Sequence, residues 1–426
     1  MRNFMALHNQ IAVSASNKEQ LINTGRTCNV TMLFSPDSVI NLEPRREPNA
    51  DEATGYEEPD SIYDLGNKSV GTLTAEKAQP QHFAFLLGYA LGTVSTVAAG
   101  TGYEHTITPI DGEEDADRSN PSFSANVRFG KTVLKRRYNS LFVDAVTATF
   151  SKDDWCKISA ELKGTGKVKD NIAEESVTAA KNATSLTLAA NAVEGDTAAE
   201  RLDNVQRIRV ELDSGEWTEV SYSAVSDDNS AVITITPPGM TSENVTYKVL
   251  FYLRGCPWLN FPARITEPPL RVAQLTFKLG GHWDGSAFQG GRTLDAEVKS
   301  VEWHFANNGD CEFVPGGGND YAGRYIRQGR EQTLKLDREF RDYILQQYID
   351  DNETFGVYIL AEGAVFDSPH KYQVEIIFPS VGILSSPISV DGKRLAEAGD
   401  MRVLEDSTYG SVIVKVKNLQ SQYAQP

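Results

Sequence analysis

Two groups of residues carry side chains that could bind a metal ion. An acidic run extends from Asp111 to Asp117, and carboxylate oxygens are the usual ligands of Ca²⁺. The run lacks the alternating ligand spacing and the closing glutamate of an EF-hand loop, which favours a solvated turn. The histidines never occur as HxxxH or HExxH, so the sequence predicts no zinc hydrolase and no metal site. These histidines are His8, His82, His105, His282, His304 and His370.

Other catalytic patterns are also missing from the sequence. The glycines of 316–318 follow Pro315 and have no lysine beside them, so they indicate a flexible loop and not a phosphate-binding loop. No G-x-S-x-G motif is present. The four cysteines are far apart and form no CxxC pair, which favours reduced thiols: Cys28, Cys156, Cys256 and Cys311. We therefore expect neither an enzyme nor a cofactor.

Two segments show strict alternation of apolar and polar residues, which is typical of a strand with one buried face. In 301–305 the apolar set contains Trp303 and Phe305, and in 158–163 the apolar residues alternate with polar ones in the same way. The aromatic residues are therefore expected in a sheet core, not in a base-stacking or sugar-binding site. The polar side chains that would point outward are Ser159, Glu161, Lys163, Glu302 and His304.

The first part of the chain predicts strands around a single helix. A strand is expected near 28–34, and a polar arm rich in Glu, Asp and Pro follows at about 43–64. The arm has two interpretations: a solvated loop, or an extended segment ordered only against a neighbouring subunit. A strand near 69–75 precedes a helix that opens at Pro80 and stops at Gly92.

Further strands follow the helix, rich in Thr, Val, Phe and Tyr, at 103–109, 122–129, 141–150 and 156–162. Composition then changes near Asn171, where an Ala- and Thr-rich stretch leads into short alternating runs at 205–212, 217–225, 231–236 and 246–253. We interpret 171–255 as an inserted small antiparallel β domain.

The regions on either side of this insertion resemble each other. GTLTAEKAQPQHFAFLLGYALG predicts a strand followed by a helix, and QTLKLDREFRDYILQQYIDD does the same, with Thr72 and Leu73 matching Thr333 and Leu334. Two strands follow each helix, at 103–109 and 122–129 in one copy and at 355–361 and 371–378 in the other. In the second helix, Tyr343, Ile344 and Tyr348 are expected to mark the buried face. The order of elements predicts a duplication.

The size and charge of the chain limit its domain number, its location and its classes of partner. A chain of 426 residues with 40% hydrophobic and 23% charged residues predicts two or three globular domains. The longest apolar run, 83–99, is interrupted by glycines and is too short for a membrane span, and the first ten residues lack signal-peptide features. We expect a cytoplasmic product with no membrane association. A net charge of −17 disfavours tight nucleic-acid binding but suits a surface that DNA must pass without sticking.

Together these stretches resemble the tail tube proteins of long-tailed, non-contractile bacteriophages. The resemblance rests on the strand–helix stretch at 71–92 and then on TGYEHTITP, NPSFSANVRFG, YNSLFVDAVTATFSKDDWCKISAELKGTG, LRVAQLTFKLGG, LDAEVKSVEWHFANN and GSVIVKVKNLQSQY. It implies a mainly β protein built from tail-tube β-sandwich domains with a flanking helix. Combined with the duplication, this predicts two tandem domains, at 1–170 and 256–426. The insertion would then lie on the tube exterior, and Ser159, Glu161, Lys163, Glu302 and His304 become candidates for the lumen.

The resemblance also implies a structural role in the virion, in the phage tail, after synthesis in the host cytoplasm. Six tube domains form each ring in this family, so two domains per chain predict homotrimeric, pseudo-hexameric rings, with a homohexamer as the alternative. Expected partners are a tape-measure protein and tail-terminator or distal tail proteins, with transient, sequence-independent passage of double-stranded DNA. A single-ring tail component of related fold is the alternative function. A secreted carbohydrate-binding β protein is disfavoured by the missing signal peptide, although glycan binding by the insertion stays open.

Overall fold

The computed structural model describes residues 7, 9–111, 120–129, 134–190, 192–227, 231–294, 297–315 and 320–425. The protein is mainly β, with antiparallel pairing in the sheets. Two compact units can be separated. Unit 1 contains residues 1–10, 126–137 and 168–260, and unit 2 contains 11–125, 138–167 and 261–426. The expected insertion, 171–255, falls within unit 1, while the division of the rest into tandem domains stays a prediction.

The elements are as follows. The helices are α1 (Pro80–Leu91), α2 (Ala198–Asn204), α3 (Ile344–Asp350) and the 3₁₀ turn η2 (Val272–Gln274). The strands up to the insertion are β1 (Gln10–Val13), β2 (Val30–Met32), β3 (Val39–Pro48), β4 (Ile62–Ala75), β5 (Gly92–Ala99), β6 (Gly102–Pro109), β7 (Phe123–Phe129), β8 (Leu134–Ser151), β9 (Lys157–Gly164) and β10 (Val168–Asp170). The strands of the insertion are β11 (Ile172–Ala180), β12 (Ser185–Thr187), β13 (Val205–Glu211), β14 (Trp217–Glu219), β15 (Tyr222–Val225), β16 (Val232–Ile235) and β17 (Asn244–Tyr252). The remaining strands are β18 (Leu275–Trp283), β19 (Phe288–Thr293), β20 (Val298–Ala306), β21 (Gly309–Glu312), β22 (Arg324–Arg327), β23 (Glu331–Glu339), β24 (Phe355–Asp367), β25 (His370–Ser385), β26 (Ile388–Asp391), β27 (Arg394–Leu404) and β28 (Ile413–Asn418).

Unit 1 is a small two-sheet domain. One sheet has the order β11-β17-β13-β14 and the other has the order β12-β16-β15. Alternate residues of both sheets meet in one apolar core that includes Val210, Ile233 and Phe251. The short helix α2 begins with a capping box in which Thr197 accepts from the backbone of Glu200. The single strand expected at 217–225 is two strands, β14 and β15.

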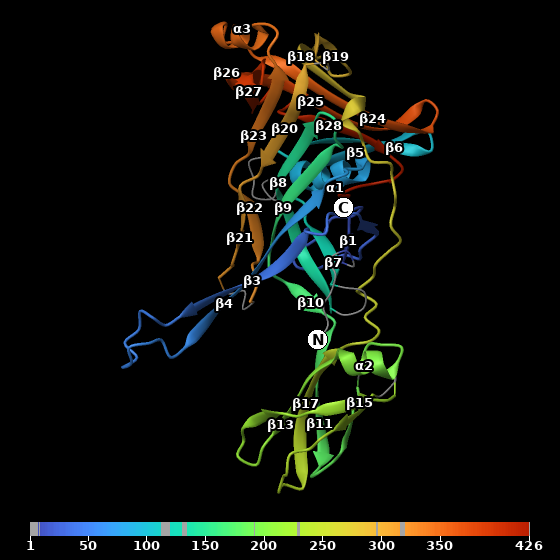
Figure 1. The fold of residues 1–426 in the computed structure, drawn as a ribbon, viewed down its shortest axis with the longest axis vertical. Helices are drawn as coiled ribbons and strands as arrows, with labels where there is room; N and C mark the ends of the chain where they lie inside the picture. The colour runs from blue at the N-terminus through green and yellow to red at the C-terminus, as the bar shows by residue number, and fades with distance from the viewer. Residues whose placement is uncertain are drawn as a thin grey trace. The chain divides into compact units, whose positions relative to one another are not determined.

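In unit 2, eight antiparallel strands form a continuous sheet. Their order is β3-β4-β9-β8-β20-β23-β27-β26, and each neighbouring pair is hydrogen-bonded (Figure 1). At its centre, β8 pairs with β20 from Ser151↔Ser300 to Ala145↔Ala306. This pairing joins residues about 150 positions apart in sequence, on either side of the insertion.

A second series of strands in unit 2 has the order β5-β6-β28-β25-β24-β18-β19. The long strand β25 belongs to both series, because its second half also pairs with β27. The strand β5 was not expected: the sequence prediction ended the helix at Gly92 and began the next strand at Tyr103. Exposed and half-buried residues alternate along most of β5, so its core signal is weak.

Helix α1 lies inside unit 2 and not on its flank. All twelve of its residues are buried, because PQHFAFLLGYAL is apolar on every side. Phe83 stacks on Phe150 of β8 with ring centroids 6.2 Å apart, and the helix also contacts β6 and β28. The expected start at Pro80 and stop at Gly92 are confirmed, and Gly92 takes the left-handed conformation, φ 100°, that ends a helix.

The first turn of α1 is held by a buried carboxyl group. The backbone N–H of Gln81 donates to Glu267 Oε2 at 2.9 Å. Burial raises the pKa of Glu267 to about 7. The carboxyl group of Glu267 therefore binds its proton more tightly in the folded state than in the unfolded chain. The protonated group stabilises the fold at low pH, and this stabilisation is lost as the pH rises from about 4.5 through 7.

Glu267→Gln should flatten that pH dependence. Relative to the wild type, the variant should gain about 3 kcal/mol of unfolding free energy between pH 5 and pH 8, measured by urea denaturation. Glu353→Gln, at an exposed glutamate, is the matched control and should follow the wild-type profile. Parallel profiles for Glu267→Gln and the wild type would show that this carboxyl group does not titrate in that range.

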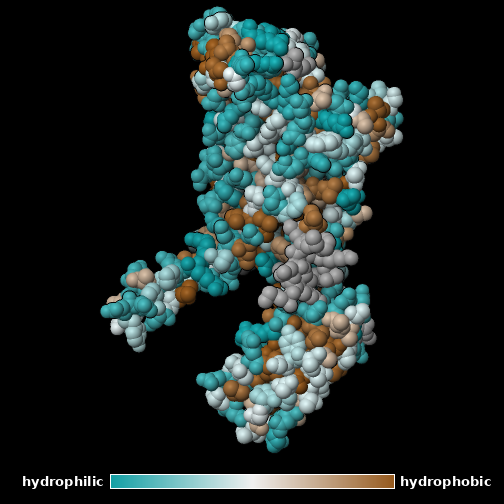
Figure 2. Space-filling model, in the orientation of Figure 1, coloured by the Kyte–Doolittle hydropathy of each residue, from teal (hydrophilic) through white to brown (hydrophobic). Residues whose placement is uncertain are grey.

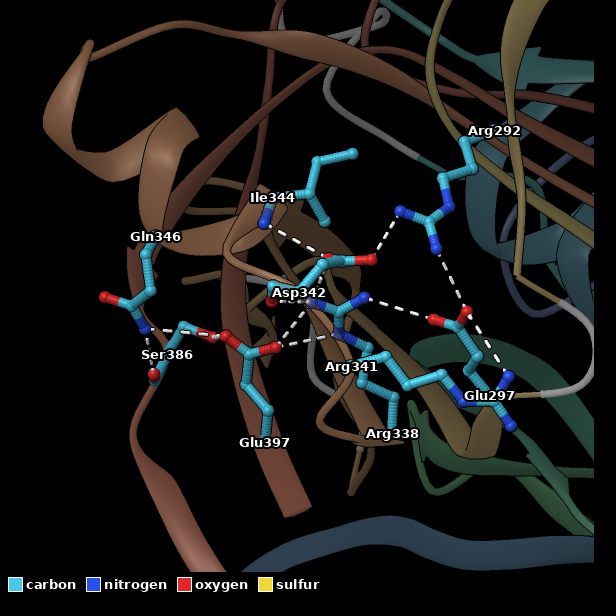
Figure 3. A network of polar contacts seen from close by, with 9 residues as sticks. All are labelled: Arg292, Glu297, Arg338, Arg341, Asp342, Ile344, Gln346, Ser386 and Glu397. Atoms are coloured by element: carbon cyan, nitrogen blue, oxygen red, sulfur yellow. Dashed lines mark hydrogen bonds and ion pairs between the residues drawn. The ribbon is translucent and has the colours of Figure 1, made fainter. Parts of the chain in front are cut away.

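Helix α3 is attached to the sheet by a buried ionic network (Figure 3). Arg338 of β23 is fully buried and pairs with Glu397 of β27 at 2.6 Å, with Asp342 at 3.1 Å and with Glu297 at 3.3 Å. Asp342 in turn accepts from the backbone N–H of Ile344 at the start of α3. The network fixes the positions of β23, β27 and α3 relative to one another.

The apolar face expected for this second helix is confirmed only in part: Ile344 and Tyr348 are half-buried, and Tyr348 lies against Phe355 with ring centroids 4.3 Å apart. Tyr343 precedes the helix and is 69% exposed, whereas Leu345 is its buried residue. The helix has only seven residues, so an aromatic one position before its start does not share the face that packs on the sheet. The expected order of strand and then helix is confirmed by β23 and α3.

The polar arm is a β-ribbon at its base and a loop at its tip, because the strands end at Pro48 and resume at Ile62. β3 and β4 continue their antiparallel pairing out to Pro48↔Ile62, and the arm extends from the sheet (Figure 1). The pairing satisfies backbone N–H and C=O groups without burying side chains, which is how a polar segment can be ordered. Tyr56 and Ile62, at 76% and 70%, are among its exposed side chains.

Two sequence predictions fall on parts of the chain outside the described residues. These are the acidic run from Asp111 to Asp117, of which Asp111 alone is described, and the glycines of 316–318. None of the four cysteines, which all lie among the described residues, forms a disulfide bond. Among the described residues, no helix has the length and apolar character needed to cross a membrane.

Candidate functional site

The outward face of the eight-strand sheet collects most of the candidate residues. One row of directly opposed residues crosses six strands: Thr74, Ser159, Thr147, His304, Thr333 and Arg402. Ser159 and His304 thus lie in the same row, separated by Thr147, whose hydroxyl contacts His304 Nδ1 at 3.0 Å. Residues directly opposite in a sheet point to the same side, so the row belongs to one face.

Neighbouring rows contain the two candidate glutamates. Glu161 lies opposite Thr72 on β4 and Ala145 on β8, while Glu302 lies opposite Thr149 on β8 and Lys335 on β23. Along β9 and β20 the residues between the candidates are buried. The alternation expected from sequence is therefore the alternation observed.

Lys163 has different surroundings from the other four candidates. A bulge between Val143 and Ala145 shifts the register of β8, and Lys163 pairs with Asp144 at 2.8 Å. Its ammonium also donates to the carbonyl of Gly309 at 2.7 Å, at the start of the β21–β22 hairpin. Lys163 therefore anchors this hairpin to the end of the sheet.

The charges of this face are nearly balanced. By register, its described residues include six cations and eight carboxylates: Lys68, Lys157, Lys163, Lys335, Arg394, Arg402, Glu43, Glu161, Glu302, Glu331, Glu339, Asp337, Asp391 and Asp400. The surplus of acid expected from the net charge is not concentrated here. A larger share lies in the arm, where 43–64 contains eight carboxylates and two arginines.

The cations of the face are paired with carboxylates. Arg402 binds Glu331 and lowers the pKa of that carboxyl group. Lys157 lies 2.9 Å from Asp154, and hydrogen bonding to Asp154 raises the pKa of the lysine. Exposed pairs of this kind add little stability. Their effect is to leave few unpaired ammonium or guanidinium groups for a polyanion to bind.

The sequence predicted most of the strands of this face but assigned outward side chains on only two of them, β9 and β20. The outward residues of β8 and β23 were missed, among them Thr147, Thr149 and Thr333. Their signal was present, because VTATF in β8 and TLKLD in β23 alternate with period two. What the sequence could not supply was the order in which the strands pair.

The two edge strands of the sheet, β3 and β26, have exposed apolar side chains. On β26, Ile388 is 42% and Val390 is 73% exposed, and Val390 lies opposite Leu395 of β27, which is 48% exposed. Figure 2 shows a hydrophobic patch in this region, near α3. On β3, Val39 is 37% exposed. Open edges with apolar residues readily pair with another chain.

No protein-family model and no curated protein matches this sequence. Function must therefore be argued from the site. Within the described residues no group of three or more His, Cys, Asp or Glu is arranged to hold a metal ion. The arrangement that is present is a wide polar face of paired charges and threonines, bounded by two edge strands with exposed apolar side chains.

Proposed function

We propose that this chain is a tail tube subunit of a long-tailed bacteriophage, a structural virion protein that stacks in rings around the path of the genome. The observation that carries the proposal is the strand order of the eight-strand sheet. It divides into β3-β4-β9-β8 and β20-β23-β27-β26. In each half the second strand leads to a helix, then to a hairpin, and then to the two remaining strands, with the extra strand β7 before them in the first half.

This correspondence supports the tandem duplication expected from sequence. In each half the strand that comes last in the sequence, β9 or β27, pairs with the second strand of the sheet order, β4 or β23. The hairpins after the helices are β5–β6 and β24–β25. The sequence alone instead matches the strands 103–109 and 122–129 of the first copy with those of the second hairpin. Each half would then be one tail-tube domain.

The central β8–β20 pairing supplies a model for contacts between chains. It joins the last edge of the first half to the first edge of the second half. The same contact between β26 of one chain and β3 of the next would continue the sheet around a ring and remove both open edges. Three chains would then give six domains and a barrel of about 24 strands.

Such a barrel is wide enough for duplex DNA. At about 4.8 Å between strands, the untilted circumference is about 115 Å and the diameter about 37 Å, and strand tilt widens it. The lumen would be the face described above, with Ser159, Glu161, Glu302 and His304 exposed to it. DNA would pass without sticking mainly because the cations of this face are already paired with carboxylates. Repulsion between DNA and the net negative charge of the chain would contribute less.

The proposal is tested by electron microscopy of the purified full chain. Long tubes of stacked rings are expected. A single ring that does not polymerise would favour the alternative, a distal tail or tail-terminator protein, and a chain that stays monomeric at high concentration would contradict both. A tape-measure protein inside the tube and terminator or distal tail proteins at its ends are the partners this function requires.

Charge reversal in the proposed lumen should separate assembly from DNA passage. The double variant Glu161→Lys, Glu302→Lys should form tubes of normal length, since neither side chain lies in the core. Virions that carry it should be at least about tenfold less infectious, because unpaired ammonium groups would retain the phosphate backbone. The glutamine variants at the same positions are the matched control, and normal infectivity of the lysine variant would argue against the lumenal placement.

A further inference from the structure

The segment between β20 and β23 lies against the first half of the sheet. Its hairpin, β21–β22, brings Asp310 to within 2.8 Å of Lys68 on β4. The carbonyl of Asp320 accepts from the backbone N–H of Asn67 at 2.7 Å, and the backbone N–H of Ala322 donates to Thr165 at 2.8 Å. This ribbon therefore fills the end of the first half, next to β4 and β9.

The β3–β4 arm occupies the corresponding position in the chain. Each ribbon joins the first strand of its half to the second: β3 to β4 in one case and β20 to β23 in the other. The arm, however, makes its pairings within itself and extends from the sheet (Figure 1). If the halves are equivalent, the arm has a docking site of the same kind on a second half.

Register identifies where that site lies. Thr72 is opposite Glu161, and Thr333, its counterpart, is opposite Arg402. Asn67 and Lys68 precede Thr72 by five and four residues, so their counterparts before Thr333 are Gln328 and Gly329. The ribbon contacts the first half at Asn67 and Lys68, beside the end of β9. The matching place in the second half is 328–329, beside the end of β27.

A cavity of about 590 Å³ is present at this position. It is lined by residues that include Arg327, Gln328, Arg330, Arg402 and Glu405. In the first half the chain's own ribbon contacts the equivalent place at Asn67 and Lys68, and a smaller cavity of about 350 Å³ remains beside Gly71, Glu161 and Leu162. The cavity of the second half is larger, and it lies where a ribbon like β21–β22 would dock if the halves are equivalent.

The chemistry of the cavity favours a carboxylate. Nε and Nη2 of Arg330 are both buried and have no hydrogen-bond partner in the described part of the chain. These two nitrogens form the fork that binds a carboxylate with two parallel hydrogen bonds, as Arg136 does with Asp170 at 2.5 and 2.7 Å. Arg402 is already paired with Glu331, and Asp111 and Glu405 also line the cavity. The carboxylates of Asp111 and Glu405 are close enough to favour the charge of Arg330, but its two buried nitrogens have no hydrogen-bonded carboxylate among the described residues.

The arm supplies carboxylates and apolar contact area together. Residues 49–64 contain six Asp or Glu and no Lys or Arg. Tyr56 and Tyr63, which are 76% and 47% exposed, offer aromatic surface on the same segment. We infer that the acidic arm of one copy docks into the Arg330 cavity of a neighbouring copy, as β21–β22 docks on the first half within one chain. This inference rests on the proposed function, because it requires rings of this chain.

Charge swapping tests the contact. The variants are a pocket reversal, Arg330→Glu, an arm reversal, Glu57→Arg with Glu58→Arg and Asp60→Arg, and their combination. Each single reversal should weaken association of the purified full chain by about tenfold in sedimentation velocity. The combination should recover to within about threefold of the wild type, which loss of fold in either parent would not allow.

Matched controls are exposed charge reversals in unit 1, Lys181→Glu and Glu211→Arg, which should associate as the wild type does. Arg330→Gln, with thermal melting of every variant, shows whether the pocket variants fold. Arm reversal without effect would overturn the inference, and so would a pocket effect that the combination does not reverse, since the pocket would then have another occupant. If the wild type forms tubes in those cases, the proposed function stands alone, whereas a monomeric wild type overturns both.

Discussion

Replacing Arg338 with methionine should lower the free energy of unfolding by about 3 to 5 kcal/mol. The guanidinium is fully buried and is the shared partner of Glu397, Asp342 and Glu297. Methionine fills much of the same volume but leaves Glu397, also fully buried, without its cation. An unpaired buried carboxylate is the expected source of the loss.

Urea denaturation of the full chain measures this effect. The matched control is Arg394→Met, because Arg394 also pairs with a glutamate but is 74% exposed, and its loss should cost under about 1 kcal/mol. Adding Glu397→Gln to Arg338→Met should recover part of the stability, since it removes the stranded charge. A loss below about 1 kcal/mol for Arg338→Met would mean that the network does not stabilise the position of α3.

Introducing aspartates on the edge strand β26 should abolish ring formation. Ile388 and Val390 are exposed in the single chain, so Ile388→Asp with Val390→Asp should leave the fold intact. In the proposed ring these residues meet β3 of the next chain, which leads directly into the acidic arm. Aspartate has low strand propensity and would repel those carboxylates, and charged residues on an edge block pairing between chains.

The readout is the fraction of protein in rings or tubes, by electron microscopy and sedimentation velocity. The double aspartate variant should stay monomeric at concentrations where the wild type assembles, with an unchanged circular dichroism spectrum. Threonine at both positions is the matched control, because it keeps a β-branched side chain without charge and should still assemble. Tubes formed by the aspartate variant would exclude β26 as the contact that closes the ring.

Much of the local structure could be predicted from the sequence. Alternation placed Glu302 and His304 on the outward side of β20, and Pro80 and Gly92 marked the ends of α1. These features depend on residues close together in the chain, so periodicity and capping signals are sufficient. The same holds for the small β domain of 171–255, whose short strands are bounded by turn residues.

Other features depended on contacts that a sequence does not display. The pairing of β8 with β20 joins segments on either side of the insertion, and the buried cation Arg338 looked like an ordinary polar residue of an alternating strand. The arm was undecided between loop and ordered segment because its pairing satisfies the backbone while leaving polar side chains in solvent. The flanking position of α1 was implied by the family resemblance, whereas in the structure all twelve of its residues are buried.

The central claim is that one chain supplies two equivalent four-strand segments to a DNA-conducting tube. A cryo-EM map of the assembled tube tests it most directly. The account predicts three chains per ring, with β3-β4-β9-β8 and β20-β23-β27-β26 side by side around the lumen and β26 paired with β3 of the next chain. Six chains per ring, each contributing one four-strand segment to the lumen, would contradict it.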